Sequence, residues 1–526
     1  MPEVSQSIVP PPFPPDYRAS GVLLPVTSLP TPYGIGDVGP IAFAWIDQLQ
    51  KAGQHWWQAL PMGPTGYGDS PYQALSSFAS NGLLISPEVL LKEGLLHESA
   101  CQVSFPSNVV DYGEASQFKQ RLLDQTWGSF SSGIRRDLQP VYEEFCHRQA
   151  HWLEDYALFR ALKQKYLGVS FHDWPLQLVR RTSGALNQAR RELSKLIAKV
   201  RFAQFLIFQQ ARELKKYAHS RGIGLIGDLP FFVSPDSCDI WAHSNLFLLD
   251  EEFRPRFVAG VPPDYFSEDG QLWGNPVYDW EALSRTNFQF HIDRLRALLD
   301  YVDVIRLDHF RAFTAAWHVP ADSPTARTGQ WVSGPGVKFF YEVKKQLGVL
   351  PFIAEDLGII TSDVCALRDE FHLPGTRVLQ FAFDGNRENP HLPANYSTNT
   401  VVYTGTHDNN TVRGWFENLS ELERERVRGQ LNRPNVKSEN SAEELVQTAW
   451  RSPAALAIAP LQDLLNLGSE ARMNLPGSST GNWSWRAPQD LLNALVLERL
   501  RDLTATSRRA GKCQPLSALR ANVTRL

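Results

Sequence analysis

Short apolar runs with the character of buried β-strands recur along this chain. Several end directly in polar or charged residues, and patterns typical of amphipathic helices lie between many of them. Alternating strand and helix patterns favour a parallel sheet with helices packed outside it. Eight such units predict a closed (β/α)8 TIM barrel. The eight runs are Gly21–Pro25, Trp56–Leu60, Gly224–Leu229, Val302–Leu307, Phe352–Glu355, Val378–Phe383, Val401–Tyr403 and Ala455–Ala459.

The spacing of these runs is uneven, which predicts insertions into the barrel. Between the second and third runs, apolar residues recur at helical spacing, for example at Trp152, Tyr156 and Phe159. We therefore expect a large helical insertion after strand 2, over about residues 85–220.

Three other segments have a distinct composition. A shorter, loop-rich insertion is expected after strand 3, over about residues 234–300, and it includes the turn-rich segment Gly260–Pro276. Residues 1–17 are rich in proline and predict an extended N-terminal tail, which leaves residues 18–526 as the catalytic barrel. The basic charges over residues 500–526 are interpreted as a solvated helix face.

Composition and charge exclude several classes of protein. The net charge of −4 gives no electrostatic reason to expect nucleic acid or an anionic membrane surface as a partner. No apolar run is long enough to predict a transmembrane helix, and the N-terminus has no signal-peptide pattern. The five cysteines are scattered without CxxC spacing, which favours a reducing compartment over disulfides or zinc. We expect a cytoplasmic enzyme.

The segment DVIRLDHFR (Asp303–Arg311) carries the strongest chemical signal. Alternate side chains of a strand share a face, so Arg306 and Asp308 point the same way. Two charges at the end of a buried strand need partners, and the mouth of a barrel, where active sites lie, provides them. Arg306 should keep Asp308 ionised, as a nucleophile requires. A structural ion pair closing the barrel rim is the alternative.

Three further strands end in acids. The pair Glu355–Asp356 follows one strand, His407–Asp408 follows another, and Asp228 ends a third. One residue of the first pair should project into the mouth, and the pattern does not decide which. A barrel would bring these carboxylates together on one rim.

Carboxylates on one rim suit glycoside chemistry, which needs a carboxylate nucleophile or base and a carboxylic acid. A metal site is an alternative, but it would require several histidines at ligand spacing. His309 and His407 qualify individually, and each could equally hydrogen-bond a sugar hydroxyl. A phosphate-binding barrel is disfavoured, because the late loop Ser478–Arg486 contains a single glycine.

Aromatic residues in the predicted loops favour a sugar polymer as substrate. The chain contains 15 Trp, 15 Tyr and 29 Phe, and flat rings can stack on sugars or simply fill a core. Rings in loops are harder to explain as core than rings in strands. The loop aromatics are Tyr67, Tyr72, Tyr265, Trp273, Trp483 and Trp485.

These segments resemble a known family. The motifs SLPTPYGIGD, TGYGDSPYQ, GDLPFFVSPDS, GVPPDYFSEDGQLWGNPVYDW, IRLDHFRAF, IAEDLG, TGTHDNNT and ARMNLPGSSTGNWSWR are similar to those of amylomaltase. This family comprises the 4-α-glucanotransferases of glycoside hydrolase family 77, called disproportionating enzymes in plants. The resemblance extends from about residue 20 to about residue 490.

The resemblance implies a retaining double displacement. Asp308 matches the nucleophile and Glu355 the general acid/base. Asp408 matches a third carboxylate that grips hydroxyls of the transferred sugar. The substrate-binding positions implied are Tyr67, Tyr72, Asp228, Trp273, Arg306, His309, His407 and Asn482.

The expected activity is transfer of α-1,4-glucan segments between maltooligosaccharides, with neither a metal nor an organic cofactor. The loop Gly260–Pro276 is a plausible cover that excludes water from the reaction. The alternatives are an α-glucan hydrolase of the α-amylase type and a non-catalytic glucan-binding protein. The sequence predicts no oligomeric state.

Overall fold

The computed structural model describes residues 12–14, 16–263, 267–478 and 480–510. Tyr265 and most of the proline-rich segment lie outside these residues. Among the described residues, no helix has the length and apolar character needed to cross a membrane. Cys101, Cys146, Cys238 and Cys365 are free thiols in this part of the chain.

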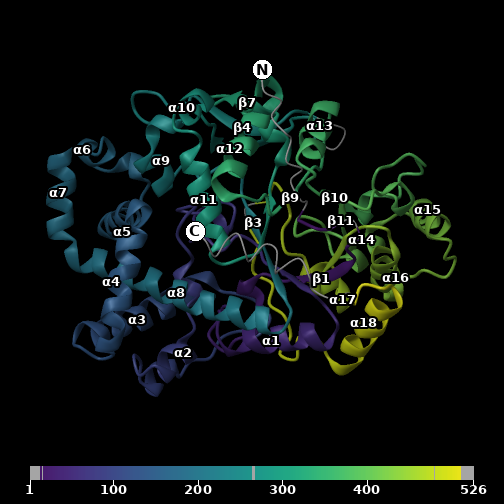
Figure 1. Cartoon of the computed structure of the whole chain (residues 1–526), viewed down its shortest axis with the longest axis horizontal. Helices are drawn as coiled ribbons and strands as arrows, with labels where there is room; N and C mark the ends of the chain where they lie inside the picture. The colour runs from purple at the N-terminus through teal and green to yellow at the C-terminus, as the bar shows by residue number, and fades with distance from the viewer. Residues whose placement is uncertain (1–11, 15, 264–266, 479, 511–526) are drawn as a thin grey trace.

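A closed barrel of parallel strands forms the centre of the molecule, as Figure 1 shows. Its hydrogen-bonded order is β1-β12-β11-β10-β9-β6-β3-β2, so that the last strand pairs with the first and neighbours follow one another along the chain. This arrangement confirms the predicted (β/α)8 barrel. The strands are β1 (Ala19–Leu23), β2 (Trp56–Gln58), β3 (Gly224–Leu229), β6 (Val304–Leu307), β9 (Phe352–Ala354), β10 (Gly375–Val378), β11 (Thr400–Tyr403) and β12 (Leu456–Pro460).

The sixth strand of the barrel differs from its prediction. The apolar run Val378–Phe383 contributes only Val378 to β10, and a 3-10 helix follows over Leu379–Phe381. The true strand contains Thr376 and Arg377, which look unlike a buried strand in the sequence. Both residues contact Asp356, so their polar groups are satisfied at the edge of the core.

Helices surround the barrel and form the insertion, as Figure 1 shows. Each packs through an apolar stripe; in α12, for example, Phe339, Phe340, Val343 and Leu347 are buried at spacings of one, three and four residues. The helices are α1 (Pro40–Lys51), α2 (Pro87–Lys92), α3 (Tyr112–Ser131), α4 (Gln139–Arg148), α5 (Ala150–Lys165), α6 (Leu176–Val179), α7 (Ser183–Glu192), α8 (Ser194–Ser220), α9 (Cys238–Ala242), α10 (Trp280–Arg285), α11 (Gln289–Leu299), α12 (Val337–Leu347), α13 (Ser362–Glu370), α14 (Val412–Asn418), α15 (Glu421–Leu431), α16 (Ser438–Arg451), α17 (Leu461–Leu464) and α18 (Ala494–Thr506).

The segment between β2 and β3 is helical and lies to one side of the barrel, where Figure 1 draws α2–α8 in blue. It has its own aromatic core. The rings of Phe130 and Phe202 stack with centroids 4.3 Å apart, and Tyr142 and Phe205 pack around them. The long helix α8 leads directly into β3 and so joins this core to the barrel.

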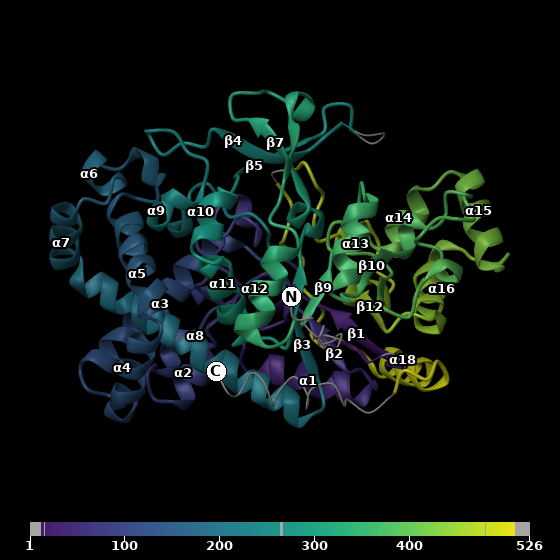
Figure 2. The same ribbon diagram turned by 45° about the horizontal axis from the view of Figure 1, so that its top comes forward.

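A small antiparallel sheet lies above the barrel, at the top of Figure 2. Its order is β5-β4-β7-β8. The expected loop Gly260–Pro276 therefore contains the end of one strand and all of another, paired as a hairpin. The glycines and prolines that signalled a loop lie at its turn and at its irregular register. The strands are β4 (Phe257–Val261), β5 (Gln271–Pro276), β7 (Ala315–Pro320) and β8 (Gln330–Ser333).

The end of the proline-rich segment closes the N-terminal end of the barrel. Phe13 is buried, stacks on Tyr17 with ring centroids 5.1 Å apart, and contacts the edge of Trp56 at 5.9 Å. The Trp56 ring fills the barrel axis so closely that a Cβ on Gly224 would lie 2.5 Å from it. Residues 12–17 are thus not a free extended tail where they are described; the ring of Phe13 has enough apolar surface to anchor them.

The sequence suggested that the basic residues near the C-terminus are solvated, and for one of them this is wrong. Arg509 is fully buried beneath β1 and β12. Its guanidinium donates to backbone oxygens of Trp450 at 2.6 Å, Ala19 at 2.9 Å and Ser452 at 2.9 Å. Burial, and then the nearby charge of Arg18, lower the pKa of Arg509 to about 9. The side chain fits because carbonyl oxygens replace its water.

Candidate active site

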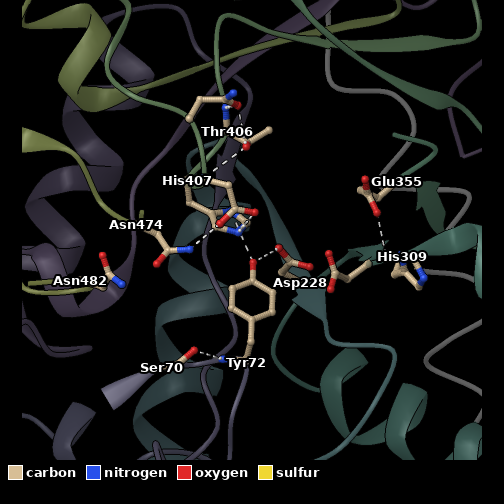
Figure 3. Close-up of polar contacts among 12 residues, drawn as sticks. Ser70, Tyr72, Asp228, His309, Glu355, Thr406, His407, Asn474 and Asn482 are labelled. Atoms are coloured by element: carbon tan, nitrogen blue, oxygen red, sulfur yellow. Dashed lines mark hydrogen bonds and ion pairs between the residues drawn. The ribbon is translucent and has the colours of Figure 1, made fainter. Parts of the chain in front are cut away.

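Polar side chains gather at the carboxyl end of the barrel strands. Asp228 ends β3, Asp308 follows β6, Glu355 follows β9, and the pair His407–Asp408 follows β11. Figure 3 shows Tyr72 between Asp228 and His407, with Glu355 beside His309. The closed barrel therefore brings together acids that are far apart in the sequence, at the end where barrel enzymes bind substrate.

Arg306 links two of the acids. Its Nη1 atom lies 2.8 and 2.9 Å from the two carboxylate oxygens of Asp228, and 2.9 Å from Oδ1 of Asp308. The side chain of Asp228 is completely buried, whereas 26% of the Asp308 side chain is exposed. Asp308 is thus held in place by a buried guanidinium and still presents an oxygen to the mouth, as the strand alternation predicted.

Tyr72 extends this network across the mouth. Its hydroxyl donates to Oδ2 of Asp228 at 2.8 Å and lies 3.4 Å from Nδ1 of His407. Its ring stacks on His407, with centroids 5.0 Å apart, and Trp483 packs against both rings. Burial, followed by the charge of Asp228, raises the pKa of Tyr72 well above its ordinary value, so the hydroxyl remains a donor.

Glu355 is in a different electrostatic environment from Asp308. Burial, and then the negative charge of Asp308, raise the pKa of Glu355 well above its ordinary value, although Arg306 opposes the shift. Its Oε2 accepts a hydrogen bond of 2.7 Å from the backbone N–H of His309. His309 has a left-handed backbone with φ of 49°, a rare conformation for a residue with a side chain. That turn directs its N–H toward Glu355.

The neighbouring acid Asp356 points away from the mouth. Its carboxylate accepts from Arg368 at 2.6 Å and from the backbone N–H of Thr376 at 2.6 Å, and Arg377 lies 3.3 Å away. Asp356 is 4% exposed. Its oxygens are occupied by structural partners, which leaves Glu355 as the acid of this pair that faces the substrate side.

Asp408 lies on the opposite side of the mouth, with 48% of its side chain exposed. His407 Nε2 is 3.3 Å from its Oδ2, and the amide of Asn474 donates to its Oδ1 at 2.6 Å. Partial desolvation would raise the pKa of Asp408, but the charge of His407 and hydrogen bonds from His407 and Asn474 outweigh it and lower the pKa well below its ordinary value. Asp408 is therefore a permanent acceptor at neutral pH.

The side chain of His309 lies at the edge of the small sheet. Its ring contacts Trp273 of β5 edge to face, with centroids 4.7 Å apart, and Phe232 lies 6.4 Å away. Burial lowers the pKa of His309 to about 4, despite the nearby charge of Asp308. The imidazole is neutral at physiological pH and can both donate to and accept from a hydroxyl.

Other predicted binding residues lie farther from the acids. Tyr67 is 79% exposed on the loop after β2. The amide of Asn482 is used within its own loop, where it accepts from the N–H of Leu475 at 2.9 Å and donates to the carbonyl of Ser478 at 2.8 Å. Trp483 and Trp485 are 6% and 9% exposed, so both pack mainly within the protein.

Two site residues had no role in the sequence analysis. Asn474 contacts Asp408 directly, and Nη2 of Arg472 donates to the backbone oxygen of Asp408 at 2.7 Å. Both belong to the motif ARMNLPGSSTGNWSWR after the last strand. Polar residues that follow a barrel strand face the same rim, and that position was the signal that could have identified them.

The arrangement combines an ion-paired carboxylate, a buried carboxyl group whose pKa is raised, and a third carboxylate that accepts hydrogen bonds. Such a set can carry out nucleophilic attack with assistance from a general acid. Within the described ranges, no group of three or more His, Cys, Asp or Glu residues is placed to hold a metal ion.

Comparison with known proteins agrees with this geometry. A family model described as 4-alpha-glucanotransferase matches residues 24–492. The 4-alpha-glucanotransferase of Synechocystis is 48% identical, covering 91% of this chain and 95% of the relative, and that of Thermus thermophilus is 46% identical, covering 94% and 99%. The structure of amylomaltase from Streptococcus agalactiae in complex with acarbose is 36% identical with a TM-score of 0.90, covering 94% of this chain and all of that one.

Proposed function

The chain belongs to the 4-alpha-glucanotransferase family, and from that premise we propose how its side chains carry out the transfer. The observation that carries the proposal is the contrast between two acids of one mouth. Asp308 is ion-paired with Arg306, while the pKa of Glu355 is raised well above its ordinary value. One is suited to attack and the other to donate a proton.

In the first step, an Asp308 oxygen attacks the anomeric carbon of the donor glucan. Glu355 gives its proton to the glycosidic oxygen, the carbon–oxygen bond to the leaving chain breaks, and the transferred segment becomes an ester of Asp308. Arg306 stays paired with Asp228 as the charge on Asp308 is consumed.

In the second step, Glu355 acts as a base. It takes the proton from the 4-hydroxyl of an acceptor sugar, whose oxygen attacks the same carbon, and the ester bond to Asp308 breaks. Two inversions give net retention, and the enzyme returns to its starting protonation state. This requires the two carboxyl groups to be separated by about 5–5.5 Å.

We assign Asp408 the role of gripping hydroxyls of the transferred sugar. It is ionised, exposed to the mouth and fixed from behind by Asn474 and Arg472. Its hydrogen bonds to the sugar would strengthen as the ring distorts toward the transition state. His407 and Tyr72 would bind the same sugar, whereas Tyr67, Trp273, His309 and Asn482 would contact neighbouring parts of the glucan.

Transfer rather than hydrolysis requires that water be kept from the intermediate. The hairpin of β4 and β5 is proposed as the cover, since Trp273 at its base contacts His309 beside the acids. Shortening this hairpin should raise hydrolysis relative to transfer. If the ratio of the two products is unchanged, the hairpin is not the cover.

The function itself is tested by the products formed from maltotriose. A transferase gives glucose and longer chains without a rise in total reducing ends, whereas a hydrolase of the α-amylase type raises them. A non-catalytic binding protein leaves maltotriose intact. We expect a ladder of products at constant reducing-end concentration.

The roles of the acids are tested by trapping the intermediate. With Glu355→Gln and an α-maltosyl fluoride donor, whose leaving group needs no protonation, the glycosyl ester should accumulate. Mass spectrometry of the digested protein should find the added sugar on the peptide that carries Asp308. Labelling of any other carboxylate contradicts the assignment.

The pH profile should carry the signature of Glu355. Because burial and the charge of Asp308 raise its pKa, the protonated acid persists at neutral pH, and kcat should fall as the pH rises through that raised value. The Glu355→Gln variant, assayed with the fluoride donor, should lack this basic limb.

We further propose that the enzyme works in the cytoplasm on α-1,4-glucans of the starch or glycogen type. The four described cysteines are free thiols, in keeping with a reducing compartment. Fractionation of the source cells with detection by antibody tests the location, and the loss of iodine staining of amylose on incubation with the enzyme tests the polymer substrate.

A further inference from the structure

The loop between β11 and α14 carries His407 and Asp408 at its tip, and one buried acid holds both ends of its base. Oδ2 of Asp463 accepts from the hydroxyl of Thr404 at 2.6 Å, and Oδ1 accepts from the backbone N–H of Val412 at 2.8 Å. Thr404 directly follows β11, and Val412 begins α14. The carboxylate therefore spans the base of the loop.

Asp463 makes these contacts without a counter-ion. It is 2% exposed, and among the described residues it forms no ion pair with Lys, Arg or His. A buried carboxylate without a cation is costly, and two hydrogen bonds offset only part of that cost. By contrast, the buried acid Asp37 lies 3.4 Å from the ammonium of Lys119. A neutral amide has a single acceptor oxygen and could not accept from both Thr404 and Val412, so the two contacts require a carboxylate.

The rest of the loop has its own hydrogen bonds. Inside it, Asn409 accepts from the N–H and hydroxyl of Thr406, and the hydroxyl accepts from the N–H of Asp408. These contacts make the tip a compact turn that moves as one piece. Arg472 and Asn474 hold the tip at Asp408, and Gln380 donates to the carbonyl of Asn410. Asp463 adds the contact that joins the backbone at the two ends of the loop.

We propose that Asp463 is a positioning residue of the transfer reaction, whose carboxylate clamps Thr404 to Val412 and thereby holds His407 and Asp408 against the transferred sugar. The inference rests on the proposed role of Asp408. Hydrogen bonds to an ionised acceptor are stronger than those to a neutral one, so ionisation tightens the clamp.

The clamp titrates near physiological pH. Burial raises the pKa of Asp463 to about 6, against hydrogen bonds from Thr404 and Val412 that lower it. Asp463 also lines a cavity of about 220 Å³ between α16, α17 and α18, which gives protons a route to it. The charged side chains on the helices packed around it are Arg413 on α14, Glu443 and Arg451 on α16, and Arg499 and Asp502 on α18.

Three of these neighbours are already engaged. Glu443 pairs with Arg499 at 3.0 Å, and Arg413 pairs with Glu417 at 2.8 Å. The clamp therefore responds to the protonation of Asp463 itself. It is charged and tight above about pH 6 and neutral and looser below that value.

The first test is Asp463→Asn, assayed on maltotriose between pH 5 and 8. At pH 7.5 we expect kcat to fall about 10-fold with a smaller change in KM, since misplacing a binding group by about 1 Å can cost roughly 100-fold. The ratio of wild-type to variant kcat should shrink toward one as the pH falls below 6. A ratio that is constant across this range overturns the proposal.

Stability should change in the opposite direction, which separates positioning from a structural role. The pKa of Asp463 is higher in the folded protein than its ordinary value, so its charge destabilises the fold above about pH 6 and this penalty disappears on acidification. The Asn variant should melt at the same or a higher temperature than the wild type at pH 7.5. A variant that loses activity because it melts at a lower temperature contradicts the proposal.

The second test uses Thr404, in case the first variant does not fold. Thr404→Val removes the donor to Asp463, whereas Thr404→Ser keeps it. We expect Val to lower kcat several-fold and Ser to restore it. Thr126→Val in α3 is the matched control, because its hydroxyl is buried and bonds only to the backbone of Leu122. Equal kcat for Thr404→Val and the wild type overturns the clamp, while an absence of transfer by the wild type refutes the proposed function instead.

Discussion

The two ends of the barrel both bury an arginine but use it in opposite ways. At the mouth, Arg306 binds the carboxylates of Asp228 and Asp308. At the N-terminal end, Arg509 binds backbone carbonyls alone, and aromatic rings of Phe13 and Trp56 fill the axis. One end keeps charged groups exposed for a substrate, and the other pairs its buried arginine wholly within the protein.

This difference separates reactivity from stability. At the mouth, the pKa of Glu355 is raised and Asp408 has an exposed carboxylate, which cost free energy in the empty enzyme and help only when a sugar is bound. The closed end has close aromatic packing and the hydrogen bonds of Arg509, which contribute in every state. Substitutions at the mouth should therefore change kcat with little loss of stability, and substitutions at the closed end should do the reverse.

Asp308→Asn should give the largest effect. Loss of the nucleophile should lower kcat by about 10⁴-fold or more, while Arg306 stays paired with Asp228 and the melting temperature changes little. Turnover of maltotriose and thermal unfolding by circular dichroism measure the two quantities. Binding of maltotriose by calorimetry is the control for an intact mouth. Near-normal turnover contradicts the assignment of Asp308.

Phe13→Ala tests the closed end of the barrel, where we expect a loss of stability without a loss of activity. Removing a buried phenyl ring should lower the free energy of unfolding by about 3 kcal/mol, because a cavity remains beside Trp56. Chemical denaturation measures this loss. The kcat at 25 °C should stay within about two-fold of the wild type, since the mouth is at the other end. A large fall in kcat at a temperature where the variant is folded would show that the ends are coupled.

Arg509→Met keeps most of the apolar stem and removes the guanidinium. We expect a loss of about 2 kcal/mol in the free energy of unfolding, because carbonyl oxygens of Trp450, Ala19 and Ser452 lose a charged donor. Arg508→Met, next to it and exposed, is the matched control. If both variants have the same stability as the wild type, the backbone oxygens find other partners.

Asn474→Ala should give the smallest of these effects, and it should change activity without changing stability. Asp408 loses one hydrogen bond, and kcat/KM for maltotriose should fall about 10-fold, near the lower end for a hydrogen bond to a charged group. Stability should be unchanged. Asn399→Ala is the control, because this side chain precedes β11 at the closed end and bonds to the carbonyl of His372. If the two variants lower kcat/KM equally, the hydrogen bond from Asn474 to Asp408 has no specific role in catalysis.

The sequence predicted the barrel because its strands are apolar on both faces and end in charged residues. Strand alternation was enough to place Arg306 beside Asp308. It could not decide between Glu355 and Asp356 as the acid that faces the mouth. That choice depends on Arg368 and Thr376, which belong to later elements and donate hydrogen bonds to Asp356. The family motifs supplied that assignment.

Other features depend on partners distant in the sequence and were missed for that reason. Thr404 follows β11 and Asp463 follows β12, so their hydrogen bond joins two neighbouring strand–helix units. The burial of Arg509 requires carbonyl oxygens at the end of α16 and at the start of β1, which no local pattern shows. The sequence analysis placed the sixth strand at Val378–Phe383, a few residues beyond β10. The polar residues of β10 are buried because they contact Asp356, which lies in another strand–helix unit.

The closed end also ties both ends of the described chain to one side of the enzyme. Arg509 donates to Ala19 at 2.9 Å, and Arg18 donates to Ser507 at 3.2 Å, so the first strand and the segment after the last helix are fastened together. The mouth lies at the opposite end of the barrel. A molecule immobilised on a solid support at either end of the described chain, near residue 12 or residue 510, should therefore hold its mouth away from the surface and accessible to long glucan chains.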